Sequence, residues 1–148
     1  MRLLVCILCA GFSIPAAADP GKGAVERSVI DLSPSAGQSF SRLAIENSLG
    51  DVRVEGHDGS DLVIIAVKRA PDREALERVK VSVVPDPRGP VMLRTRLVAG
   101  IESRPIAAGS IRVDLLIRAP RSSKVEARNW NGAVEVEDLE NGAELAAN

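Results

Sequence analysis

Leu43–Glu55 is LAIENSLGDVRVE, and Val125–Glu137 is VEARNWNGAVEVE. The two stretches share Asn, Gly, Val, Val and Glu at identical spacing. In each, an Asn-x-x-Gly turn lies between two runs whose apolar residues fall at every second position, the period of a strand with one buried face. We expect Gly50 and Gly132 in these turns to supply positive φ. Repetition of such a unit is typical of folds that stack strands into sheets.

The same alternation recurs along the chain, between turns rich in Gly, Pro and Asn. It predicts strands over residues 25–32, 40–47, 51–55, 62–67, 79–83, 91–97 and 111–117. The unbroken aliphatic run over 62–67 is typical of a strand covered on both faces. Residues 72–78 are the one plausible helix. We therefore predict an all-β fold: an antiparallel sheet or sandwich that leads into a short β-solenoid-like repeat, with at most one short helix.

The N-terminus has the pattern of a secretory signal peptide. Arg2 precedes an apolar run over residues 3–14, and Ala16 and Ala18 fit the A-x-A-like site that signal peptidase recognises. The apolar run is too short to span a membrane. A buried N-terminal helix is the competing interpretation. The sequence predicts that residues 1–18 are a signal peptide and that the mature protein is exported to the periplasm, the cell surface or the medium.

After the signal peptide we expect a flexible leader over residues 19–24 and a single β-rich domain over 25–148. Cys6 and Cys9 lie in the predicted signal peptide, so the mature chain would hold together without disulfides. With both cysteines removed, the predicted stability of the domain comes from its core alone.

The repeat pattern stops soon after residue 137, which indicates that the domain is incomplete at its C-terminus and that further repeats follow in a longer protein. An interrupted sheet exposes an unpaired edge. We expect that edge near Val134–Val136 to allow self-association, and we expect residues 142–148 to fray in solution.

Charge and aromatic content exclude some classes of partner. The chain has 19 Lys and Arg against 20 Asp and Glu, so no overall field attracts it to nucleic acid or to an anionic membrane. Beyond the predicted signal peptide the only aromatic residues are Phe40 and Trp130. Stacking platforms for sugars or single-stranded bases need several exposed rings, so these functions are disfavoured.

The sequence contains no recognisable catalytic or metal-binding motif. His57, the only histidine, lies in a Gly-His-Asp-Gly segment that we interpret as a solvated loop. The acidic run Glu135–Glu140 has two interpretations: a Ca²⁺ site, or a solvated strand face, which the alternating valines favour because the spacing matches no calcium-binding loop. We expect no catalytic residue, no cofactor and no bound metal.

Two features suggest an interaction surface instead. Arg94, Arg96, Arg112 and Arg118 are expected on the outer face of two neighbouring strands, either as an anion-binding patch or as a solvated face that resists edge aggregation. Trp130, in the second repeat turn, is either an exposed contact residue or a cap on the core, and the sequence does not decide between them. The candidate surface is Trp130 with Arg94, Arg96 and Arg112.

Three segments, Ile45–Gly56, Val113–Pro120 and Val125–Val136, resemble the bacterial "putative adhesin" domain of unknown function, a β-strand-repeat family. The resemblance covers nearly the whole mature chain. It implies an exported β-region that leads through a V-x-(I/L)-x-x-P stretch into repeated N-G-x-V-x-V units stacked as a β-solenoid. No catalytic residues are established for the family, so the resemblance implies none here.

Together these observations favour an exported, non-enzymatic protein with an adhesin-like, interaction or scaffolding role in the cell envelope. Its partner would be an envelope protein or a polysaccharide, and not a nucleic acid. Two alternatives stay open: an accessory protein of envelope signalling or stress, and a hydrolase whose active site is dispersed over distant strands.

Overall fold

The computed structural model describes residues 23–35, 39–86, 88–98, 107 and 109–147 of the chain. The predicted signal peptide, with both cysteines, lies outside these residues. So does most of the predicted leader.

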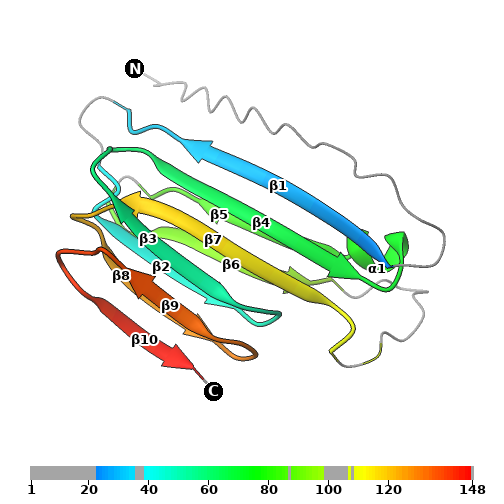
Figure 1. Ribbon diagram of the computed structural model, residues 1–148. Coiled ribbons are helices and arrows are strands. Elements are labelled where there is room, and N and C mark those ends of the chain that lie inside the picture. Colours follow the sequence, from blue (N-terminus) through cyan, green and yellow to red (C-terminus); the bar gives the residue numbers. More distant parts are fainter. Residues whose placement is uncertain (1–22, 36–38, 87, 99–106, 108, 148) are drawn as a thin grey trace.

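Within the described residues the fold is two five-stranded sheets packed face to face (Figure 1). The first sheet has the order β1-β4-β7-β3-β9, and the second has the order β10-β8-β2-β6-β5. The strands are β1 Ala24–Leu32, β2 Arg42–Asn47, β3 Val52–His57, β4 Leu62–Ala70, β5 Val79–Val84, β6 Val91–Leu97, β7 Arg112–Pro120, β8 Lys124–Asn129, β9 Val134–Glu137 and β10 Ala143–Ala147. The prediction of an all-β fold is confirmed.

Antiparallel and parallel pairing are separated in space. The ladders β1–β4, β4–β7 and β5–β6 are antiparallel. The ladders β7–β3–β9 and β6–β2–β8–β10 are parallel. The molecule therefore has an antiparallel end, at β1 and β5, and a parallel end, at β9 and β10 (Figure 1).

The two sequence repeats lie directly against each other. Leu43 pairs with Val125 and Asn47 with Asn129 in β2 and β8, and Val52 pairs with Val134 in β3 and β9. Within one repeat the two strands belong to different sheets, so the Asn-x-x-Gly turn carries the chain from one sheet to the other and is not a hairpin turn. This stacking is the pairing that a β-solenoid uses, while a longer solenoid stays a prediction.

A buried polar row supports these turns. Asn47, Asn129 and Thr95 are 0%, 1% and 6% exposed. The Nδ2 of Asn47 donates to the carbonyls of Gly50 and Val113, and the Nδ2 of Asn129 donates to the carbonyl of Gly50. The Asn47 amide thus joins its own turn to β7, and the Asn129 amide joins β8 to the turn of the first repeat. These bonds give partners to backbone carbonyls where the chain crosses from one sheet to the other, since buried backbone groups need hydrogen-bond partners.

The two turn glycines differ. Gly132 has φ +142°, as expected, but Gly50 is not among the residues with positive φ, so that expectation is wrong for Gly50. A Cβ at Gly50 would lie 2.5 Å from the carbonyl oxygen of Val113. Gly50 is needed because the backbone of β7 passes too close for a side chain.

The core lies between the inner faces of the two sheets. In β4, Leu62, Ile64 and Ala66 are buried, while Val63 and Ile65 on the outer face are only half-buried. The prediction that both faces of this strand are covered is therefore wrong. The aliphatic side chains of the outer face are shielded only in part, since no second layer of the described residues packs on that side.

A single helix occurs in the described residues. The helix α1 spans Arg73–Glu77, with Asp72 as its N-cap, and the Asp72 carboxylate accepts a hydrogen bond from the N–H of Ala75 at 2.7 Å. Ala75 and Leu76 are buried, which fixes α1 against the antiparallel end. The prediction of one short helix over 72–78 is confirmed. Among the described residues no helix has the length and apolarity needed to cross a membrane.

Candidate interaction surface

The four arginines predicted to share one face lie on two different sheets. Arg94 and Arg96 are on β6 of the second sheet, and Arg112 and Arg118 are on β7 of the first. The expectation that these strands are neighbours is wrong, because the chain changes sheet between β6 and β7. Each pair of arginines must therefore be considered with its own sheet.

On the outer face of the second sheet, arginines alternate with a carboxylate across three strands. The Nε of Arg94 lies 2.6 Å from the Oε2 of Glu46, and Glu46 pairs in register with both Arg94 and Arg128. Arg128 is exposed. The register thus places Arg94 and Arg128 on the two strands that flank Glu46.

Trp130 continues this face beyond the end of β8. Its side chain is 46% exposed, whereas the preceding Asn129 points into the core and is 1% exposed. Trp130 is not among the side chains that pack on the core, so the structure favours the interpretation as an exposed residue. Arg96 is also exposed, at the corresponding end of β6. We call Glu46, Arg94, Arg96, Arg128 and Trp130 the Trp130 face.

Arg112 has a structural environment in the first sheet. Its guanidinium contacts Asp51, and its Nε donates to Asp114 Oδ1 at 2.8 Å. Asp114 also contacts Arg69, and Asp51 Oδ1 accepts from the N–H of Ala133 at 2.9 Å. These contacts join β4, β7 and the turns of the two repeats. Arg112 therefore serves to stabilise the fold more than to bind a partner.

The acidic run of the second repeat lies around Arg53. Its guanidinium is 3.0 Å from Glu55, 3.9 Å from Glu135 and 3.0 Å from Glu137. The carboxylates of Glu137 and then Glu55 raise the pKa of Arg53. Glu135 and Glu137 are more than half exposed, which favours the solvated strand face. In the described part of the chain no three His, Cys, Asp or Glu residues are placed to hold a metal ion.

His57 is the last residue of β3 and does not lie in a loop, which corrects the sequence interpretation. Its Nδ1 accepts a hydrogen bond from the N–H of Gly59 at 2.9 Å, and its Nε2 lies 2.9 Å from the carbonyl oxygen of Asp61. An accepting Nδ1 places the ring hydrogen on Nε2, which donates to Asp61. With these two hydrogen bonds His57 closes the turn into β4.

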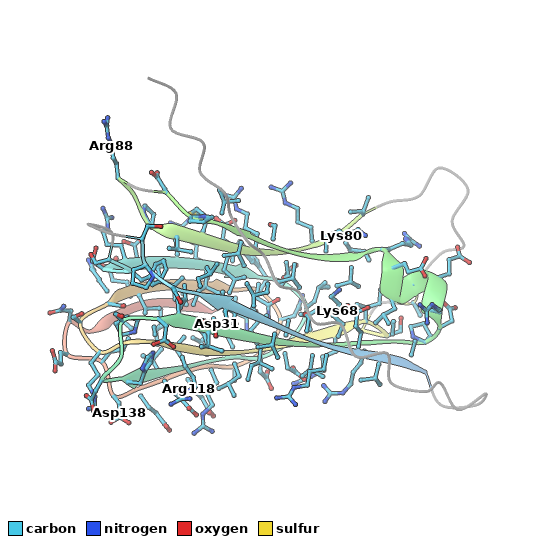
Figure 2. All side chains as sticks on the ribbon, turned by 90° about the horizontal axis from the view of Figure 1, so that it is seen from above. Asp31, Lys68, Lys80, Arg88, Arg118 and Asp138 are labelled. Atoms are coloured by element: carbon cyan, nitrogen blue, oxygen red, sulfur yellow. The ribbon has the colours of Figure 1, made fainter. Side chains whose placement is uncertain are left out.

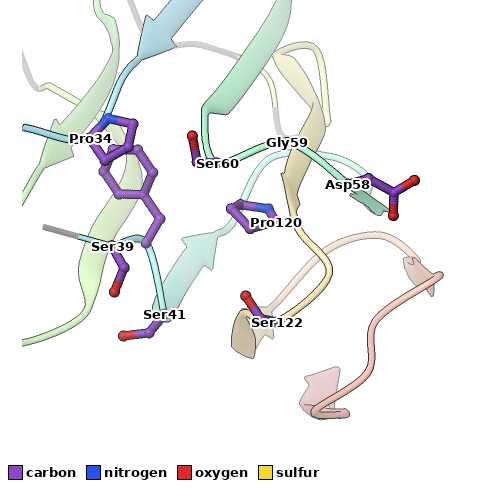
Figure 3. Close-up of a pocket in the computed structure, with 9 residues that line it drawn as sticks. Pro34, Ser39, Ser41, Asp58, Gly59, Ser60, Pro120 and Ser122 are labelled. Atoms are coloured by element: carbon purple, nitrogen blue, oxygen red, sulfur yellow. The ribbon is translucent and has the colours of Figure 1, made fainter.

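A shallow depression of about 290 Å³ lies at the end of the sandwich where β2 and β4 begin and β7 ends (Figure 3). Its charged residue, Asp58, forms an ion pair with Arg121 at 2.7 Å. Among the described residues, its lining contains no His or Cys. Its lining is rich in serine: Pro34, Ser39, Phe40, Ser41, Asp58, Gly59, Ser60, Pro120 and Ser122.

Sequence reasoning missed two parts of this description. The depression gathers residues from distant segments, and no local pattern marks it. Arg128 was missed although a signal exists, because it occupies in the second repeat the position that Glu46 occupies in the first. Aligning the two repeats predicts that these residues are neighbours.

Comparisons with known proteins bear on the fold. No family model and no curated protein matches the chain. The fold is similar to that of a solved structure from Clostridium sporogenes described as a "putative cell adhesion protein", with a TM-score of 0.50 and 12% sequence identity. The match covers 85% of this chain and 57% of that chain. The chain thus spans little more than half the length of that protein, and at this identity the likeness shows the fold alone.

Proposed function

We propose that this chain is an exported, non-enzymatic protein of the cell envelope whose outer β-surface binds another envelope component. The observation that carries the proposal is the Trp130 face, where an exposed aromatic residue follows β8 and three arginines occupy the outer positions of the parallel strands β6 and β8. The signal-peptide pattern and the fold shared with a protein described as a "putative cell adhesion protein" support it.

The chemistry of this face suits recognition. Trp and Arg are over-represented among the residues that dominate binding energy at interfaces, since each offers a large contact area together with a polar group. The Arg94–Glu46 ion pair and the strand ladders hold the face in place, which lowers the entropy lost on binding.

Export is tested by expressing the full chain in a bacterial host and sequencing the N-terminus of the protein recovered from outside the cytoplasm. We expect the mature protein to begin at Asp19. Recovery of the uncleaved chain from the cytoplasm alone would count against export.

Binding is tested separately, with isolated cell-envelope material stripped either of protein or of polysaccharide. Trp130→Ala and Arg96→Ala should reduce retention on one of the two preparations, whereas Arg118→Ala, an exposed arginine on the other sheet, should not. Equal retention of all variants would remove the Trp130 face from the proposal. Turnover of envelope material by the wild-type protein would instead support an enzyme.

A further inference from the structure

The parallel end of the sandwich has two edge strands side by side. In the described residues β9 is the last strand of the first sheet and β10 the last strand of the second, and the two strands contact each other. Figure 1 shows them together at the bottom of the molecule. Both sheets can therefore be extended at the same place.

The hydrogen-bonding groups of β9 alternate between its two sides. Val52 N–H donates to the carbonyl of Ala133, and Val52 pairs in register with Val134. In a parallel ladder this register directs the N–H and C=O of Glu135 toward β3. The corresponding groups of Val134 and Val136 consequently point to the open side, where they can pair with a further strand.

The inner positions of these strands are only partly covered. Val134 and Val136 are half-buried, and Leu145 on β10 is 49% exposed. Leu145 pairs with Ala127 on β8, and Ala127 pairs with Ile45 on β2. Ala127 and Ile45 are both almost fully buried. The apolar interior thus reaches the surface at this end.

Charges across the second sheet follow one direction. Arg94 on β6 pairs with Glu46 on β2, Arg42 on β2 pairs with Glu126 on β8, and Lys124 on β8 pairs with Glu144 on β10. At each of these three junctions the base lies on the strand nearer the antiparallel end and the acid on the strand nearer the parallel end. The first sheet repeats this direction, with Arg53 on β3 and its two carboxylate partners on β9.

The series stops at the open edge. Residues 133–147 include Glu135, Glu137, Asp138, Glu140 and Glu144, and no Lys or Arg. Neither edge strand offers a base to an added strand. A strand added at this edge therefore has to supply the Lys or Arg of the ion pair.

The antiparallel end is built differently. Glu26 of β1 pairs with Lys68 of β4 at 2.7 Å on the inner face, where the Lys68 side chain is only 14% exposed, and α1 packs between β1 and β5 (Figure 2). Inward charges and a covering helix are devices that keep other strands from pairing with an edge. In the described residues the β9–β10 edge has neither.

We propose that the β9–β10 edge accepts an extended segment of a partner protein, with apolar residues on one face and Lys or Arg on the other, as an added β-strand. This deepens the proposed function by giving a second binding surface and the chemistry of its partner. A second copy of this chain fits less well, because pairing two such edges would place Glu135 and Glu137 against the same carboxylates.

The test uses two synthetic seven-residue peptides, one alternating valine with lysine and one alternating valine with glutamate. Titration into the isotope-labelled protein should shift the amide signals of residues 133–147 with the lysine peptide only, and added salt should weaken the binding. The double variant Glu135→Gln, Glu137→Gln should weaken it about tenfold, since each carboxylate adds a modest attraction. The control Asp31→Asn, Glu74→Gln removes two acids far from the edge and should not.

The backbone is tested with Val136→Pro, which removes an outward N–H while leaving the groups that face β3, and should abolish peptide binding. Equal binding of both peptides, or shifts that avoid residues 133–147, would overturn the proposal. Self-association at the edge without selectivity for lysine would assign it to a second copy and would also overturn it. Trp130→Ala should leave peptide binding unchanged, so failure here and failure of the Trp130 face can be distinguished.

Discussion

Replacing Asn47 with alanine should destabilise the protein more than the same change at its repeat partner. The Asn47 amide donates to the carbonyls of Gly50 at 3.0 Å and Val113 at 3.2 Å, and its Oδ1 accepts from the Thr95 hydroxyl at 2.5 Å. A fourth bond, from the N–H of Leu49, is long at 3.4 Å. At roughly 1 kcal/mol for each of the three good bonds, Asn47→Ala should cost about 3 kcal/mol.

Asn129 is equally buried but makes fewer bonds. Its Nδ2 donates to Gly50 at 2.8 Å and Ala133 at 3.2 Å, and its Oδ1 has no hydrogen-bond partner in the described part of the chain. Removing a buried acceptor without a partner also removes its desolvation cost. Asn129→Ala should therefore cost no more than about 2 kcal/mol.

Urea denaturation followed by circular dichroism measures the loss of unfolding free energy in both variants, provided that the slope of this free energy against urea concentration is the same as in the wild-type protein. The control is Asn131→Ala: Asn131 is exposed and donates to the carbonyl of Ser48, and this change should cost less than about 1 kcal/mol. Equal losses at Asn47 and Asn129, or a larger loss at Asn129, would refute the reasoning from hydrogen bonds.

Three further predictions concern the glycine turns, an edge ion pair and the exposed ring. Gly50→Ala should lower the thermal midpoint strongly, because the new Cβ would clash with a backbone carbonyl. Gly142→Ala should lower it less, because a Cβ there has open space and the only cost is that of an alanine at φ +73°. Similar shifts of the two midpoints in calorimetry would contradict this. Lys124 holds the pKa of Glu144 below its ordinary value of 4.5, so their ion pair supports β10 above that pH and loses its effect as the pH falls further. The protection factors of the β10 amides, corrected for the intrinsic exchange rate at each pH, should then fall, and Glu144→Gln should remove this pH dependence. Trp130→Ala should leave the free energy of unfolding within about 0.5 kcal/mol of the wild-type value, since the Trp130 ring does not pack on the core. A larger loss, measured by urea denaturation, would favour the interpretation of Trp130 as a cap on the core.

Period-two alternation predicted most strands well, because a strand with one buried face has apolar residues at every second position. The helix at Arg73–Glu77 was predictable for a similar reason, through Pro71 and an apolar side containing Ala75 and Leu76. These features depend on residues near one another in the sequence.

What the sequence alone could not decide is which strands are neighbours. Alternation is the same in β6 and β7, so nothing local shows that Arg94 and Arg112 lie on opposite faces of the sandwich. The same holds for Gly50, whose need for glycine arises from β7, more than sixty residues further on. Within the Trp130 face, only the repeat alignment links Glu46 to Arg128.

The in-register stacking of the two repeats also shapes how the chain reaches its fold. Contacts such as that between Asp51 and the N–H of Ala133 join residues 82 positions apart, so the parallel ladders cannot form until a long intervening segment has been enclosed. Such topologies fold slowly, over milliseconds to seconds. Since β8 and β9 are held by ladders to β2 and β3, the β8–β9 unit of another molecule can form the same ladders during that time. Refolding at high concentration should therefore yield exchanged dimers, and dilute refolding should suppress them.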